Sequence, residues 1–179
     1  VMIDGGIKDI LIPNQIVTAD KISRLCGLAK RADLTVAIDN IENVRLISEI
    51  AEIQEVKIGV VVEVDTQMQR AGVRTTTQAV ELAKIANDLP GITFKGVMCH
   101  QTPEGMPDRE TRYIQGREFI QTALDAKQAI EDSGITVEIV SAGETWTYDL
   151  CADIPGVTEV EGGTYAVSYT HLRAHETDS

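Results

Sequence analysis

The sequence has few histidines, which limits the active sites it can build. It contains three, and two of them, His171 and His175, lie near the carboxyl terminus. His100 is the only histidine in the body of the chain. Histidine is the commonest side-chain ligand of metal ions, and the body of the chain offers no second one, so we expect no metal site in this chain.

Basic residues are also scarce. Lysine and arginine total 16 against 28 aspartates and glutamates, which gives a net charge of -12. A surface of this sign repels phosphate backbones and anionic lipid headgroups. The composition therefore argues against a nucleic-acid partner or a membrane-surface partner, and it is typical of an acidic cytoplasmic protein.

Cysteines are few, and long apolar runs are absent. The three cysteines share no metal-ligand spacing, so we expect buried thiols in a reducing compartment, which again indicates a cytoplasmic protein. No apolar run reaches the length of about 18 residues that a membrane span requires. The first residues do not resemble a signal peptide.

The chain is organised around the stretch from Ile58 to Val73. It begins with an apolar run, changes to polar residues at Glu63 and Asp65, and continues into a turn that contains Arg70. An apolar run of strand length that ends in polar residues is typical of a central strand in a parallel sheet. In folds built from βα units, the loops after such strands carry the chemistry.

Strand and helix patterns alternate along the chain. Strands are expected over residues 7–13, 34–39, 58–65, 92–100, 136–140 and 157–161. This alternation, with short connections, indicates βα units and a parallel sheet. Because the strands end in polar residues and no dinucleotide-binding fingerprint is present, we predict an α/β TIM-type barrel rather than a doubly wound sheet. Such a barrel has eight strands, so this one is expected to be incomplete, with one strand missing before Val1 and one after Val167.

The expected helices have recognisable caps and buried faces. Thr18, Asn40 and Thr75 are expected to cap helices, the last with Gln78 at capping-box spacing. The longest helix is expected from about residue 108 to 133, with Gly134 as its cap. Its buried face is expected to contain Phe119, Ala123, Ala126 and Ile130.

Both ends of the chain look irregular. The segment from Val1 to Gly6 resembles the last turn of a helix that closes on a glycine. The segment from Ser168 to Ser179 has no packing period and resembles a translated sequencing-adapter artefact. We therefore expect residues 1–167 to form a partial barrel domain and residues 168–179 to be a non-native tail.

Two late loops are candidates for phosphate binding. Residues 141–145 and 162–165 form small, hydroxyl-rich turns after consecutive strands, where barrels often bind phosphate through backbone N–H groups and hydroxyls. Ser141, Thr145 and Thr164 could each donate a hydrogen bond. Taken alone, each loop is more typical of a plain tight turn. Glu144 fits poorly, because a carboxylate repels phosphate unless it points to solvent.

Three further polar residues lie near strand ends. Arg70 is either a surface arginine in a solvated turn or a cation that orients an anionic cofactor or carboxylate. His100 is either structural or a partner that stacks on, or bonds to, a ring. Glu161 is either an exposed acidic side chain or a partner that keeps a pyridine nitrogen protonated. No lysine lies at the carboxyl end of a strand, where an imine with a cofactor would form.

Five segments in order resemble one known family. They are Asp9–Pro13, Val62–Val73, Gly96–Met98, Val140–Gly143 and Pro155–Tyr165. Together they resemble the barrel domain of the alanine-racemase-like family, the fold type III pyridoxal-phosphate enzymes. The resemblance is strongest to the branch of D-threonine aldolases and D-serine dehydratases, and it runs from about Val1 to Val167.

The resemblance implies pyridoxal 5'-phosphate as cofactor. It places Arg70 in a turn beside the cofactor and His100 against its ring. It makes residues 141–145, including Ser141, Gly143 and Thr145, the first phosphate loop. The second is formed by Gly163, Thr164 and Tyr165. Glu161 stands where relatives often have glutamine, and Glu144 and Trp146 replace the small residues of the usual first loop, Gly-Gly-Thr-Gly-Thr.

The resemblance also places part of the catalytic machinery outside this chain. The Schiff-base lysine of the family lies upstream of the position of Val1, and the β-domain with its divalent-metal ligands lies beyond Val167. The resemblance therefore implies a fragment, inactive alone, of a lyase that cleaves or dehydrates D-β-hydroxy amino acids such as D-threonine or D-serine. A racemase of the same fold and a non-catalytic pyridoxal-phosphate-binding protein are the alternatives. The expected partner is a small D-amino acid, and a homodimer is implied for the full-length protein.

Overall fold

The chain forms one parallel sheet with helices along one face. The computed structural model describes residues 1–100, 108–145 and 147–163. The strands are β1 (Asp9–Ile12), β2 (Asp33–Ile38), β3 (Ile58–Glu63), β4 (Ile92–Met98), β5 (Ile139–Ala142) and β6 (Glu159–Val160), paired in sequence order. The helices are α1 (Ala19–Ala29), α2 (Ile41–Ile53), α3 (Thr76–Asp88), α4 (Arg109–Asp132) and α5 (Tyr148–Ala152).

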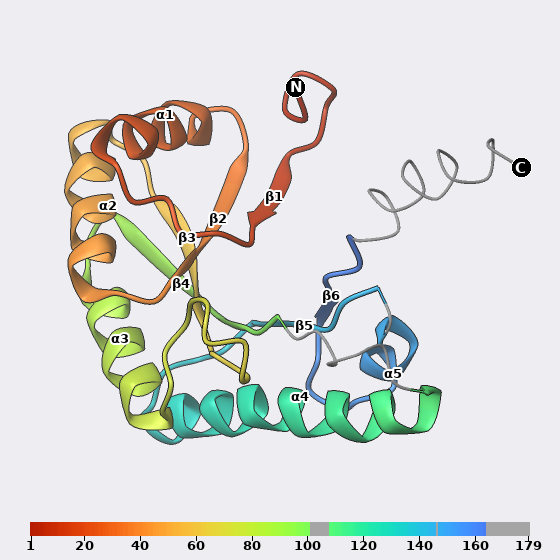
Figure 1. The fold of residues 1–179 in the computed structure, drawn as a ribbon. Coiled ribbons are helices and arrows are strands. Elements are labelled where there is room, and N and C mark those ends of the chain that lie inside the picture. Colours follow the sequence, from red (N-terminus) through yellow and green to blue (C-terminus); the bar gives the residue numbers. More distant parts are fainter. Residues whose placement is uncertain (101–107, 146, 164–179) are drawn as a thin grey trace, which may run out of the picture.

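This arrangement is a half-barrel. In Figure 1, α1 to α4 follow one another around the outside of the sheet. All strand pairs are parallel, and within the described residues β1 and β6 each pair with one neighbour only. The prediction of an incomplete TIM-type α/β barrel is therefore confirmed.

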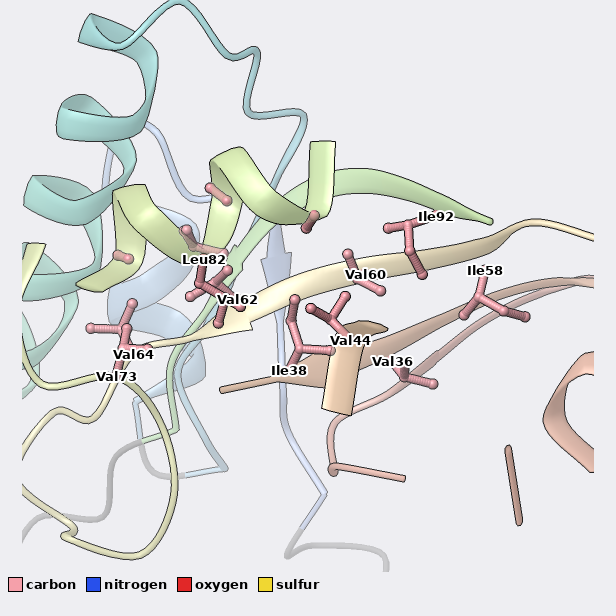
Figure 2. Packing of buried hydrophobic residues seen from close by; sticks show 14 of the residues in the cluster. Val36, Ile38, Val44, Ile58, Val60, Val62, Val64, Val73, Leu82 and Ile92 are labelled. Carbon is pink, nitrogen blue, oxygen red and sulfur yellow. The ribbon is translucent and has the colours of Figure 1, made fainter. Parts of the chain in front are cut away.

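The two faces of the sheet bury different residues, because successive side chains of a strand point to opposite sides. The outer face packs against the helices, and this larger cluster includes Val36, Ile38, Val60, Val62, Val44 and Leu82 (Figure 2). Each fully buried aliphatic side chain contributes about 2 kcal/mol to folding. The inner face holds a smaller cluster of Ala37, Val61 and Met98. Polar side chains near the carboxyl ends of the strands therefore have room on the inner face.

Two of the three predicted caps are confirmed by side-chain hydrogen bonds. Asn40 Oδ1 accepts from the backbone N–H groups of Glu42 at 2.9 Å and Asn43 at 3.1 Å. Thr75 Oγ1 accepts from Gln78 N at 3.1 Å. Thr18 occupies the N-cap position of α1, but its side chain makes no capping hydrogen bond to the described residues. The third cap is therefore positional only.

The longest helix begins and ends as predicted, but its buried face differs at one position. Asp108 is its N-cap, and Gly134, with a φ of +89°, follows its C-cap. Ile120 is fully buried, whereas Phe119 is only partly buried. The prediction of Phe119 is wrong because Ile120 lies nearer the centre of the stripe that contains Ala123 and Ile130.

The first residues form the predicted glycine-closed turn. Gly6 has a φ of +95°, its N–H donates to Ile3 O at 3.0 Å, and Ile7 N donates to Met2 O at 3.2 Å. This bond pattern is that of a Schellman motif. The predicted tail, residues 168–179, lies outside the described residues.

Two further features are the burial of the cysteines and the hydropathy of the helices. The three cysteines, Cys26, Cys99 and Cys151, are all buried, as predicted. None of the helices in the described segments is long and apolar enough to cross a membrane.

Candidate cofactor site

Strand alternation brings three predicted site residues to the inner face of the sheet. Met98 belongs to the inner cluster, so His100, two residues later, is directed to the same side. Ser141 pairs in register with Met98 and with Glu159. Glu161 lies two residues after Glu159. Because the carboxyl ends of parallel strands meet at one edge, these side chains gather in one place.

Two adjoining cavities open at this edge. The larger has a volume of about 660 Å³, and its wall includes His100, Ser141, Glu161, Gly162, Gly163, Leu11 and Pro13. The smaller, of about 370 Å³, is lined by Thr145, Tyr148, Val160 and Gly162. Val160 and Gly162 belong to both walls. Concave sites of this size, largely apolar with a few convergent polar groups, are typical of small-molecule binding.

Glu161 is an acid of this site with a strongly raised pKa. Burial raises the pKa of Glu161 to about 7, while a hydrogen bond from Ser141 and the positive charge of Arg70 oppose the rise. Its backbone N–H donates to Ala142 O at 3.2 Å. Within the described part of the chain, Glu161 Oε1 is buried without a hydrogen-bond partner. Near neutral pH this carboxyl is therefore partly protonated and keeps one position open for a ligand.

His100 presents a neutral imidazole to the larger cavity. Burial, together with the nearby charge of Arg70, lowers the pKa of His100 from 6.5. The backbone at this position is held by Thr66, whose hydroxyl donates to His100 O at 3.1 Å. An uncharged ring at the cavity wall is suited to stacking or to a single hydrogen bond.

Arg70 lies beside the larger cavity rather than on its wall. Its side chain lines a separate hollow of about 570 Å³ with Asp39 and Gly72. The turn is fixed by two bonds, from Gly72 N to Asp39 Oδ2 at 3.0 Å and from Val73 N to Glu63 O at 2.8 Å. The charge of Arg70 nevertheless affects the pKa values of both His100 and Glu161. Its guanidinium therefore acts on the inner face electrostatically.

Glu63, which the sequence did not single out, lies near the site, because its charge raises the pKa of Glu161. It ends β3, is only 4% exposed, and accepts a hydrogen bond from the side chain of Gln15. Burial raises the pKa of Glu63, whereas the bond from Gln15 and the charge of Arg70 oppose the rise. The signal was present in the sequence, since Glu63 shares the inward parity of Val61.

The first predicted phosphate loop has a tighter structure than expected. Ser141 lies within β5, which runs to residue 142 instead of ending at 140, because Ser141 pairs with strands on both sides. Gly143 has a φ of +88°, and a Cβ there would lie 2.3 Å from Cys151 Sγ. Glu144 is 2% exposed, so it does not point to solvent. Only glycine fits this turn, and the Glu144 side chain is directed into the protein.

The second predicted phosphate loop is described only in part. Gly162 lines both cavities, and Gly163 lines the larger one. An added Cβ at Gly163 would meet no atom within 4 Å, so this backbone borders open space. Thr164 and Tyr165 lie outside the described residues, and their roles stay predictions.

Comparisons with known proteins agree with this architecture. The chain matches the family described as alanine racemase, N-terminal domain, over residues 8–170. It is 35% identical over 164 residues to a 3-hydroxy-D-aspartate aldolase of Paracoccus denitrificans (strain Pd 1222), covering 90% of this chain and 42% of that protein. It is 32% identical over 175 residues to a D-threonine aldolase of an Arthrobacter species, covering 97% and 46% of the two chains.

A solved structure of a D-threonine aldolase is also similar to this chain. The D-threonine aldolase from Filomicrobium marinum has a TM-score of 0.86 and 27% identity to this chain, covering 92% of this chain and 45% of that one. The chain spans less than half the length of these three relatives. The family predicted from the five sequence segments is confirmed. This chain belongs to the alanine racemase N-terminal domain family.

Proposed function

We propose that this chain is the barrel part of a pyridoxal-phosphate-dependent lyase that acts on D-β-hydroxy amino acids, by retro-aldol cleavage or dehydration. The observation that carries the proposal is the cavity in which His100, Ser141 and Glu161 meet at the carboxyl ends of neighbouring strands. The names of its relatives, a 3-hydroxy-D-aspartate aldolase and two D-threonine aldolases, favour a lyase over the racemase alternative.

The described residues fit the proposed cofactor. Glu161 Oε1 is buried at the larger cavity and lacks a partner in the described chain, so it suits the nitrogen of a pyridine ring. Leu11 and Pro13 supply apolar wall for the ring. The smaller cavity, between Thr145 and Gly162, suits the phosphate group. An acidic protein would thus hold this anion with hydroxyl and backbone groups in place of a basic patch.

Each residue has a distinct role in this proposal. When bound, pyridoxal phosphate would supply an electron sink for the pair left on the substrate α-carbon, whether the bond broken there is to the β-carbon, as in retro-aldol cleavage, or to hydrogen, as in dehydration. Glu161 holds a proton at the pyridine nitrogen, and Ser141 keeps the carboxyl oriented through its hydrogen bond. His100 packs its neutral ring at the cavity wall. Arg70 adds positive charge near the anionic cofactor.

Other features of the whole protein are also proposals. A divalent metal ion would polarise the substrate hydroxyl. In the ranges that the structure describes, no group of three His, Cys, Asp or Glu side chains is placed to hold one. We propose that its ligands, like the imine-forming lysine, come from parts of the relatives' length that this chain does not span. A small D-amino acid substrate, a homodimer and a cytoplasmic location remain proposed.

Titration with pyridoxal phosphate tests the proposal. The single tryptophan, Trp146, lies in sequence between Thr145 and Thr147, so its fluorescence reports on the proposed phosphate loop. We expect saturable quenching by the cofactor, and weaker binding of about tenfold in Glu161→Gln, because glutamine cannot form a charged bond to the ring nitrogen. Glu138→Gln, at an exposed position before β5, is the matched control. Unsaturable quenching, or equal affinity in all three proteins, contradicts the proposal.

A further inference from the structure

A polar cluster joins α4 to α5 near the smaller cavity. Arg109 Nε and Nη2 donate to the Tyr113 hydroxyl at 3.1 and 2.9 Å, and Nη2 also donates to Asp149 Oδ2 at 3.1 Å. The Tyr113 hydroxyl donates to the same carboxylate oxygen. Figure 1 shows α5 beside the first turns of α4. One carboxylate on α5 is thus bound by two side chains of α4.

The two helices also touch directly beside this cluster. Gly116 lies one turn after Tyr113 and is buried. A Cβ at Gly116 would lie 3.0 Å from Leu150 Cδ2 and 3.2 Å from Thr147 Cγ2. The hydrogen bonds of Tyr113 and Asp149 therefore border a close packing contact, which fixes the distance between α4 and α5.

Helix α5 in turn shapes the first predicted phosphate loop. Thr147 is fully buried, its Oγ1 accepts from Glu144 N at 3.3 Å, and its N–H donates to Glu144 O at 3.1 Å. Cys151 Sγ packs so close to Gly143 that a Cβ there would lie 2.3 Å from it. The loop from Gly143 to Thr145 is therefore held by contacts with α5 and its N-cap, so the position of α5 bears on the backbone beside the smaller cavity.

We propose that the hydrogen bond between Tyr113 and Asp149 is a positioning contact for the phosphate end of the cofactor site. This inference rests on the proposed function. Helix α5 has only five residues, and a helix of that length does not hold its place without tertiary contacts. The Tyr113–Asp149 bond ties it to α4, a helix of 24 residues. Tyr113 and Asp149 are thus positioning residues that act through α5.

If the Tyr113–Asp149 contact served only the stability of the whole fold, Tyr113→Phe would lower the urea midpoint of unfolding markedly. The positioning role predicts a different result. Arg109 and Asp149 have side chains that are 71% and 38% exposed, and ion pairs this exposed add little to global stability. The Asp149 carboxylate that Tyr113 binds is likewise partly exposed, so we expect Tyr113→Phe to lower the urea midpoint of unfolding only slightly. The effect should instead appear locally, in residues 143–151.

Hydrogen exchange on the ligand-free chain tests the contact itself. In Tyr113→Phe and in Asp149→Asn, we expect the hydrogen-bonded amides of residues 143–151, such as those of Thr147 and Cys151, to exchange about tenfold faster, because α5 opens locally more often. Asp132→Asn is the matched control, since Asp132 accepts a side-chain bond from Gln128 at 2.8 Å at the far end of α4. Unchanged exchange in residues 143–151 of both variants overturns the inference.

A comparison of pyridoxal phosphate with pyridoxal, which lacks the phosphate, tests whether the contact acts on the phosphate end of the cofactor site. In Tyr113→Phe we expect the dissociation constant for pyridoxal phosphate to rise about tenfold and that for pyridoxal to stay unchanged. Equal weakening for both compounds, or normal binding of both, overturns the inference alone. A wild-type chain that binds neither compound contradicts the proposed function, and with it the cofactor role of this contact.

Discussion

Replacing Glu161 by glutamine tests whether burial at the cavity wall controls the charge of this carboxyl. Burial raises the pKa of Glu161 from 4.5 to about 7. The charged form is therefore disfavoured in the folded chain relative to the unfolded chain. The contribution of Glu161 to stability is therefore fully present below pH 4.5, and it is lost as the pH rises through 7. The loss amounts to about 3 kcal/mol.

Urea unfolding across this pH range measures the effect. Glutamine has nearly the same volume and does not ionise, so the Glu161→Gln variant does not lose this stability as the pH rises. The free energy of unfolding of the variant, minus that of the wild type, should grow by about 3 kcal/mol from pH 4.5 to values above 7. Glu138→Gln should show no such growth. Ser141→Ala, which removes an opposing hydrogen bond, should move the change to higher pH. A constant difference for Glu161→Gln refutes the reasoning.

Three further predictions test the fold by urea denaturation. Gly143→Ala puts a Cβ 2.3 Å from Cys151 Sγ at a φ of +88°, and should cost about 3 kcal/mol. Asn40→Ala removes the cap of α2 and should cost about 1 kcal/mol, while Asn40→Asp keeps it. Ile120→Ala should cost about 3 kcal/mol, and Phe119→Ala less, because Phe119 is partly exposed. Equal costs at positions 119 and 120 would contradict the observed buried face.

Local patterns predicted the elements of this fold well, because their causes are local. The apolar run that begins at Ile58 forms β3, and Asn40 caps the helix that its side chain indicates. Boundaries were less accurate where tertiary pairing decides them. Residues 136–138 precede β5, and the strand continues through Ser141 because its neighbours offer bonding partners there.

The candidate site depended more on the tertiary structure. The sequence placed Arg70 and His100 after strands, but it did not show that His100 lines the cavity while Arg70 lines a neighbouring hollow. It suggested that Glu144 fits a phosphate loop only when exposed, whereas the fold buries this side chain. These outcomes follow from the curvature of the sheet and from α5, which no local pattern encodes.

The sequence by itself determined the family, the alternation of strands and helices, and the end of the sheet at which the polar residues gather. These features follow from the periodicity of apolar residues and from short sequence motifs, which are local and do not depend on how the elements pack. Only the tertiary structure decided that Glu63 is buried, that Glu161 has a pKa of about 7, and that Tyr113 reaches Asp149. Burial and contacts between distant segments set these properties, and both arise only when the chain has folded.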